Sequence, residues 1–244
     1  MCGRFVSSST PDEIARYFGV DAIGEKVLEP NYNTAPSSTI YTVRERDEQR
    51  VLDAVHWGLV PFWAKDLKIG NRMINARSET LAEKNAFKRP FAKRRCIIPG
   101  DGFYEWEKVP GQKNKQPWYI TRRDGDPFAF AGLWERWREP TDDGEPDPDV
   151  EPLISATIIT GSPNESMAEI HHRMPVMLPP DRWDAWLDPE MNDLAELASW
   201  FVPAPSELIQ KHRVSTEVNN ARNRGPHLIE PYEPEAPTLP LDPR

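Results

Sequence analysis

Short runs in which apolar and polar residues alternate dominate the chain, and they predict many strands with few helices. A short strand follows Arg4, and residues 45–50 form a charged turn that joins two strands as a hairpin. The later strands are separated by glycine, proline and charged residues. The predicted strands cover residues 39–44, 51–57, 95–99, 103–106, 118–122, 128–134, 153–160 and 213–218.

Helical periodicity is confined to short segments. Thr10 at an N-cap, Pro11 at the first helical position and Glu13 at N3 predict a helix over residues 11–18, which Gly19 ends. A short helix capped by Ser78, another opened by a capping box at residues 162–165, and amphipathic helices over 181–187 and 192–201 complete the set. The pattern predicts one α+β domain built on a strongly curved sheet.

Three segments have the composition of loops. Residues 31–36 carry asparagine and proline, which favour turns. Residues 139–152 are rich in acids and proline and predict an exposed, mobile loop rather than a domain boundary, because strand patterning resumes at once. From Glu230 the chain has five prolines in fifteen residues, so a domain over 1–230 followed by a disordered or extended tail over 231–244 is expected.

Composition narrows the class of protein. The 244 residues suit one large domain or two small ones, no run approaches the ~18 apolar residues of a membrane helix, and the start lacks a signal pattern. We therefore expect a cytoplasmic protein without membrane contact. Two distant cysteines, Cys2 and Cys96, form neither a disulfide framework nor a metal motif, and no cofactor is indicated. No heptad pattern appears, which favours a monomer.

Charge is segregated along the chain. The net charge of −9 argues globally against nucleic acid, but residues 65–95 hold ten basic and three acidic residues. Residues 139–151 hold seven acidic residues and no basic one. Such segregation can focus a field over one cleft, although a solvated basic face would look the same.

Four features carry candidate chemistry. If Met1 is removed, Cys2 presents an α-amine and a thiol on adjacent carbons, a pair that condenses with aldehydes, although Cys2 could equally be buried and inert. Glu105 lies among aromatic and aliphatic residues, where reduced hydration would raise a carboxyl pKa. The aromatic loop over residues 57–63 beside basic residues suits base stacking, with Trp57 equally suited to the core. His171, in a tight turn before a proline, suits a proton donor better than a zinc ligand.

These segments together resemble the SOS response-associated peptidase (SRAP) family, in order from residue 2 to about residue 230. The motifs that carry the resemblance are Met1-Cys2-Gly3-Arg4-Phe5, Asn33-Thr34-Ala35-Pro36, Trp57-Gly58-Leu59-Val60-Pro61, Asn75-Ala76-Arg77-Ser78-Glu79-Thr80, Arg95-Cys96-Ile97-Ile98-Pro99, Gly102-Phe103-Tyr104-Glu105-Trp106 and Ile170-His171-His172-Arg173-Met174-Pro175.

The resemblance implies a single domain with a distorted β-barrel-like core and peripheral helices. It also implies a protein that shields abasic sites in single-stranded DNA through a covalent crosslink and associates with the nucleoid when on DNA. It places the catalytic groups on Cys2, Asn75, Glu105 and His171. It places DNA contacts on Arg4, Asn33, Phe62, Trp63, Arg77, Trp106 and Arg173. His172 departs from the family, which usually has Asp there.

The implied chemistry is a single turnover. The Cys2 amine, with a reference pKa of ~7.7–8.0, forms an imine with the sugar aldehyde, and the thiol closes a thiazolidine ring. Glu105 would shuttle protons, His171 would protonate the sugar ring oxygen and Asn75 would orient the amine. The peptidase label would then describe removal of Met1, possible without another enzyme, and the crosslinking is lyase-like.

Two other classes stay open. A glutamine amidotransferase also uses an N-terminal Cys, there as a thiol nucleophile, but Arg4 replaces the usual aliphatic residue. A non-covalent reader of modified DNA bases would need the basic and aromatic surface alone.

Overall fold

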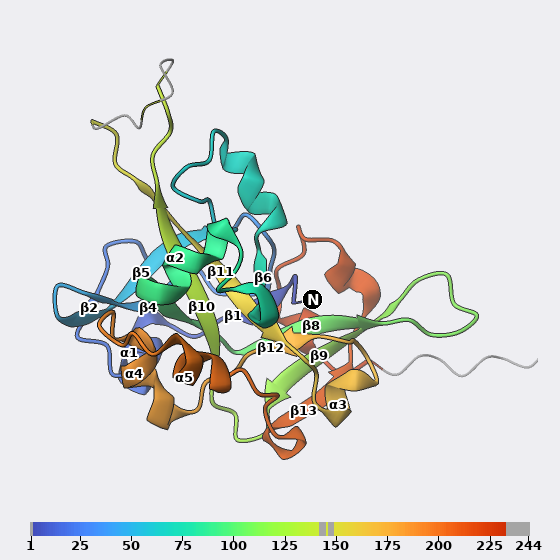
Figure 1. The fold of residues 1–244 in the computed structure, drawn as a ribbon. Coiled ribbons are helices and arrows are strands. Elements are labelled where there is room, and N and C mark those ends of the chain that lie inside the picture. The colour runs from blue at the N-terminus through green and yellow to red at the C-terminus, as the bar shows by residue number, and fades with distance from the viewer. Residues whose placement is uncertain (1, 142–144, 146–148, 233–244) are drawn as a thin grey trace, which may run out of the picture.

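The computed structural model describes residues 2–141, 145 and 149–232, and their strands form two curved sheets (Figure 1). The smaller sheet has the order β13 (Ile209–Arg213), β9 (Gln116–Arg122), β8 (Gly102–Glu107), β1 (Phe5–Ser7), β3 (Asn31–Thr34). The larger has the order β12 (Met174–Pro175), β11 (Leu153–Gly161), β10 (Phe128–Trp137), β7 (Arg95–Gly100), β4 (Thr39–Arg46), β5 (Gln49–Trp57), β2 (Ala22–Ile23), with β6 (Asn75–Arg77) beside β11.

Five strands of the larger sheet close into a barrel. Antiparallel pairing runs from β11 through β10, β7 and β4 to β5. The ring closes because β5 also pairs with β11 in parallel, with Ser155 opposite His56 and Ala156 opposite Trp57. The expected α+β fold with a distorted barrel core is therefore confirmed.

Short helices surround the barrel. The helix predicted over residues 11–18 is confirmed as α1 (Pro11–Phe18) with the expected capping box. The Thr10 hydroxyl accepts from the Glu13 N–H at 3.3 Å, and the Glu13 carboxylate accepts from the Thr10 N–H at 2.8 Å. Gly19 ends the helix at φ 64°, a conformation that favours glycine. The other α-helices are α2 (Asn85–Lys93), α3 (Glu165–Ala168), α4 (Trp183–Leu187) and α5 (Leu194–Ser199).

Alternate residues of one barrel strand supply two separate cores. On β7, Ile97 belongs to a cluster that packs under α1, α2, α4 and α5. Cys96 and Ile98 belong to a second cluster that joins the two sheets and includes Cys2 and Phe5. The start of the chain is thus part of the packing between the sheets.

Several predicted elements need correction. Residues 213–218 are not a strand, since β13 ends at Arg213 and Thr216–Asn219 is a 3₁₀ turn (η5). Asn31–Thr34, expected as loop, pairs with β1 as a strand. Ser78 caps nothing, because it is itself the first residue of the 3₁₀ turn η2 (Ser78–Thr80). Asn164, rather than Ser162, caps α3 by accepting from the Met167 N–H.

The hairpin, the early strand and the strands expected between 95 and 160 are present, mostly with an extra residue or more at one or both ends. The predicted helices over 181–187 and 192–201 correspond to α4 and α5, which are shorter, with a 3₁₀ turn η3 (Pro180–Arg182) before α4. The remaining 3₁₀ turns are η1 (Leu67–Arg72), η4 (Ser206–Leu208) and η6 (Pro226–Ile229). Most of the expected tail and the centre of the acidic loop lie outside the described residues.

Candidate functional site

Cys2 lies between the two sheets, just before β1. Antiparallel pairing of β1 with β8 continues beyond Phe5, because the Tyr104 N–H donates to the Arg4 carbonyl at 3.0 Å. Cys2 has no exposed surface, and its Sγ lies 3.9 Å from the Arg4 carbonyl oxygen. Figure 1 places the start of the chain beside β6 and β8, the strands that carry Asn75 and Glu105.

Asn75 holds the backbone of Cys2. Parallel pairing of β6 with β11 sets Asn75 opposite Ile158, and the Asn75 Nδ2 donates to the Cys2 carbonyl at 2.7 Å. The Oδ1 of the same amide is buried and makes no hydrogen bond within the described part of the chain. A buried acceptor without a donor is costly, so this oxygen is suited to accept from an amine on Cys2.

Glu105 and His171 form a pair beside Cys2. Glu105 is buried on β8, and its Oε1 lies 4.0 Å from the Nδ1 of His171, in the turn between α3 and β12. The Nδ1 accepts from the Arg173 N–H at 3.0 Å and lies 3.2 Å from the Arg173 carbonyl oxygen. When the His171 ring is neutral, an unprotonated Nδ1 can therefore accept from the Arg173 N–H. When the ring is protonated, the Nδ1–H can donate to the Arg173 carbonyl or to the Glu105 carboxylate.

Burial shifts the pKa values of both the Cys2 thiol and His171. It raises the pKa of the Cys2 thiol, and the nearby Glu105 carboxylate raises it further. It lowers the pKa of His171, while Glu105 opposes that change. At neutral pH the thiol keeps its proton, so the site is built poorly for a thiolate that attacks first.

Arg4, Asn33 and Trp106 form a second cluster, next in the chain to Cys2 and Glu105. The Arg4 guanidinium donates to the Asn33 Oδ1 at 2.7 Å and to the Val218 carbonyl at 3.0 Å, and lies 5.9 Å from the Trp106 ring centre. Burial lowers the pKa of Arg4. Asn33 is itself buried, and its Nδ2 donates to three carbonyls between residues 218 and 223. This cluster ties the start of the chain to its last described segment.

Arg173 is engaged by Glu79, a residue to which the sequence interpretation gave no role. The two guanidinium nitrogens of Arg173 bind both carboxylate oxygens of Glu79, one of them at 2.9 Å. This contact lowers the pKa of Glu79 to about 2. Glu79 stands in the motif over residues 75–80, but no local pattern indicates a partner 94 residues away.

The remaining expected DNA contacts lie on the surface. Arg77 is exposed on β6, and Phe62 and Trp63 are each about half exposed. Trp57, from the same aromatic stretch, is buried and packs edge-on against Phe5 with ring centres 5.1 Å apart. The ambiguous aromatic loop therefore divides into a core residue and an exposed tip.

His172, the departure from the family pattern, is exposed and stacks on His171 with ring centres 4.3 Å apart. Its proximity lowers the pKa of His171 slightly further, after burial. An acidic residue in its place would act in the opposite direction.

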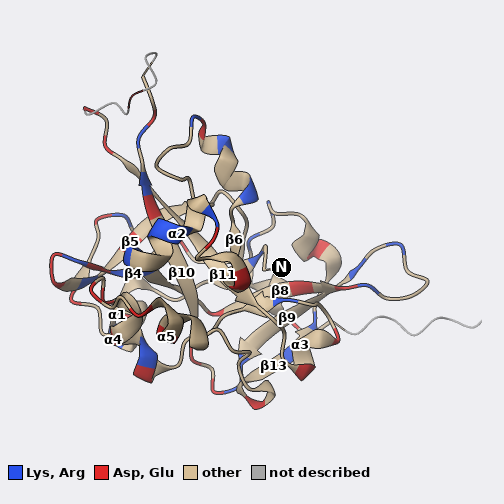
Figure 2. Ribbon diagram, viewed as in Figure 1, with Lys and Arg blue, Asp and Glu red and all other residues tan. Residues whose placement is uncertain are grey.

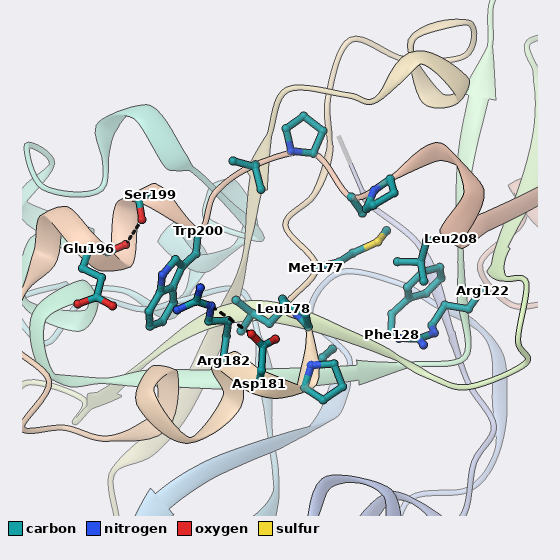
Figure 3. Close-up of a pocket in the computed structure, with 17 residues that line it drawn as sticks. Arg122, Phe128, Met177, Leu178, Asp181, Arg182, Glu196, Ser199, Trp200 and Leu208 are labelled. Carbon is teal, nitrogen blue, oxygen red and sulfur yellow. Dashed lines mark hydrogen bonds and ion pairs between the residues drawn. The ribbon is translucent and has the colours of Figure 1, made fainter.

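Three further features of the described residues concern metal ligands, membrane helices and cavities. No three His, Cys, Asp or Glu side chains gather there as metal ligands, and no helix there is long and apolar enough to cross a bilayer. A cavity of about 570 Å³ lies apart from Cys2 and is lined by Leu178, Trp200 and other mainly apolar residues (Figure 3). None of the expected catalytic residues lines it.

Comparisons with known proteins agree with the motifs. A family model described as SOS response associated peptidase (SRAP) matches residues 1–221. The abasic site processing protein YoqW of Bacillus subtilis is 42% identical over 95% of this chain and 100% of its own length. The abasic site processing protein YedK of Escherichia coli is 34% identical over the same shares.

Solved structures also resemble this chain in fold. A crystal structure of a protein from Bacteroides thetaiotaomicron matches with a TM-score of 0.82 at 26% identity, over 95% of this chain and 100% of that one. By sequence along most of its length and by fold, the chain belongs to the SRAP family.

Proposed function

We propose that the protein shields abasic sites in single-stranded DNA by forming a covalent thiazolidine crosslink through Cys2 after Met1 is removed. The observation that carries the proposal is the convergence of Asn75, Glu105 and His171 on Cys2. The relatives YoqW and YedK, named as abasic site processing proteins, support the substrate class.

Burial of Cys2 makes removal of Met1 the gating step. Hydrolysis of the Met1–Cys2 peptide bond consumes a water and frees the α-amine. Because Cys2 has no exposed surface, a sugar cannot reach it before this end of the chain changes, and in this proposal hydrolysis of the Met1–Cys2 bond is that change. The chain with Met1 in place is then unreactive toward aldehydes.

The amine attacks first. An opened abasic sugar presents an aldehyde at C1′, to which the neutral amine adds, and loss of water leaves an imine. The buried acceptor Oδ1 of Asn75 orients the amine, while the Nδ2 fixes the Cys2 carbonyl. His171 donates a proton to the ring oxygen as the sugar opens.

The thiol reacts second. Its sulfur adds to the imine carbon, the imine nitrogen gains a proton, and the thiol proton leaves to a base. Glu105 is the carboxylate that is electrostatically coupled to this thiol, so it is the natural acceptor. The five-membered ring that closes is more durable than an imine, which suits a shield rather than a catalyst of many turnovers.

We also propose that residues 1–230 act as one unit, that the protein works as a monomer in the cytoplasm, and that it meets the nucleoid through damaged DNA. Single-strandedness fits the exposed Phe62 and Trp63, whose rings could stack on unpaired bases.

The test is a denaturing gel of purified protein mixed with a single-stranded oligonucleotide that carries one abasic site. A shifted band that resists denaturation, has the mass of protein lacking Met1 plus DNA, and vanishes in Cys2→Ser supports the proposal. No adduct from protein shown by mass to lack Met1 would sink it. If protein with Cys2 intact and Met1 removed binds the DNA but forms no adduct, and Cys2→Ala binds equally well, the reader of modified bases is favoured instead.

A further inference from the structure

A basic surface lies where the exposed Phe62 meets the end of β10. A hollow of about 320 Å³ is lined by Phe62, Arg94, Arg136, Arg138 and Pro152, and we refer to it as the Arg–Phe62 hollow. Beside it, the Arg89 guanidinium on α2 lies 5.2 Å from the Phe62 ring centre. Figure 2 shows Lys and Arg positions along α2 and at this end of β10.

Positive charge in the hollow exceeds what the described residues neutralise. Burial, together with the neighbouring guanidinium groups of Arg89 and Arg136, lowers the pKa of Arg94 to about 10. Buried Glu135 pairs with Arg94. Arg89 and Arg136 are exposed and have no ion pair among the residues that the structure describes.

The hollow is separate from the reactive groups. On β11, Ile154 is the partner of Arg136 and Ile158 is the partner of Asn75, on opposite sides of the strand. Four residues at ~3.4 Å and two strand spacings of ~4.8 Å put the two backbones about 17 Å apart. That distance corresponds to about five phosphates at B-form spacing.

We propose that the Arg–Phe62 hollow is a second anchoring site for nucleic acid, which binds backbone phosphates on Arg89, Arg94 and Arg136 while Phe62 stacks on a base. The inference rests on the proposed function, because it assumes that DNA also occupies the Cys2 site. An exposed ring among guanidinium groups suits a nucleic acid better than an acidic peptide, which has no bases to stack.

The test uses the double variant Arg89→Ala/Arg136→Ala and a control that also removes two arginines, the exposed Arg46 and the half-buried Arg182, as Arg46→Ala/Arg182→Ala. Arg182 is a matched cation, since it lies 5.0 Å from the Trp200 ring centre. Arg182 lines the cavity of Figure 3, and so does Phe128. Phe128 and Arg136 are eight residues apart on β10, or about 27 Å, so the control substitution at Arg182 lies far from the hollow.

Binding of undamaged oligothymidylate is measured in a Cys2→Ser background between about 50 and 300 mM salt, because counterion release reports phosphate contacts. Loss of two contacts lowers the slope of log K against log salt by about 1.4, and at ~0.1 M salt weakens binding roughly 25-fold. The control double variant keeps the wild-type slope. An unchanged slope in Arg89→Ala/Arg136→Ala overturns the inference. The inference also fails if this double variant loses binding to a polyglutamate peptide while its DNA binding stays intact, because the hollow would then be a site for an acidic peptide.

Crosslinking to abasic DNA gives an independent measurement. The protein concentration for half-maximal rate should rise in Arg89→Ala/Arg136→Ala, while the rate at saturation stays unchanged because the hollow does not touch the reacting atoms. A fall in the saturated rate alone would contradict the anchoring role. If no crosslink forms at all, the proposed function fails, and the oligothymidylate slopes still decide the inference.

Discussion

The protonation of His171 gives the sharpest test of the proposed mechanism. Productive attack needs a neutral Cys2 amine and a protonated His171, yet the free amine has the higher reference pKa. With reference values of ~7.8 for the amine and ~6.5 for the imidazole, only about 3% of molecules hold this combination midway between the two values. Burial lowers the pKa of His171, so the productive fraction is smaller still.

The order of the two pKa values fixes the shape of the pH–rate profile. The crosslinking rate should rise with pH up to the pKa of His171, stay flat, and fall about tenfold per pH unit above the pKa of the amine, near ~8. His171→Gln keeps a hydrogen-bonding group but cannot become a charged acid. Its rate should drop by about 10²- to 10⁴-fold near neutrality and should no longer fall at high pH.

The measurement is a single-turnover time course with protein in excess, quenched in denaturant and quantified on gels from about pH 5.5 to 9.5, a range that spans both reference pKa values. Abasic DNA incubated without protein at each pH corrects for strand cleavage. The same fall at high pH in His171→Gln would show that another group supplies the proton. A wild-type rate that stays flat above pH ~9 would refute the need for an acid.

Three further changes test the contacts around the site. Glu79→Gln frees Arg173 for phosphate and should tighten DNA binding in a filter assay, at a cost of up to ~1 kcal/mol of stability because the pair is half exposed. Because the pKa of Glu79 is lowered from 4.5 to about 2, its ion pair stabilises the wild type fully above pH 4.5, and this stabilisation is lost as the pH falls through about 2. The free energies of unfolding of the wild type and Glu79→Gln should therefore converge in acid. Asn75→Ala leaves the Cys2 carbonyl without its donor and should slow crosslinking by about 10- to 100-fold, whereas an unchanged rate would remove Asn75 from the mechanism. Thr10→Ala removes the cap of α1 and should lower the free energy of unfolding in urea by ~1 kcal/mol, with Thr10→Ser close to wild type and crosslinking unaffected.

Local patterns predicted elements well where capping and alternation agree, as at α1 and the β4–β5 hairpin. These patterns failed to predict elements whose apolar residues are separated by basic or small residues. No helix was predicted at α2, which contains Pro90, although Phe87 and Phe91 recur at helical spacing and are buried. Val214 and Val218 resembled one face of a strand, but Val214 is buried just after β13 ends, and Val218 is buried separately in the 3₁₀ turn η5.

The candidate site was predicted by residue type, and its assembly was not. Asn75 reaches Cys2 only because β6 pairs in parallel with β11, whose partner residues lie more than 80 positions later. The barrel closes through β5 and β11, a contact of similar separation. Such registers depend on the packing of whole sheets, and alternation within one strand carries no information about its partner.

Burial of Cys2 was the observation expected of an inert core cysteine, and its polar surroundings are what supports the proposed reactive role. An inert thiol needs only apolar neighbours, which Phe5 and Cys96 in its cluster provide. Around Cys2 there are also an amide oxygen without a donor among the described residues and a carboxylate beside a histidine, groups whose burial costs free energy. A pocket for an inert side chain has no reason to carry that cost, so the polar groups around Cys2 favour chemistry at the residue that the chain buries first.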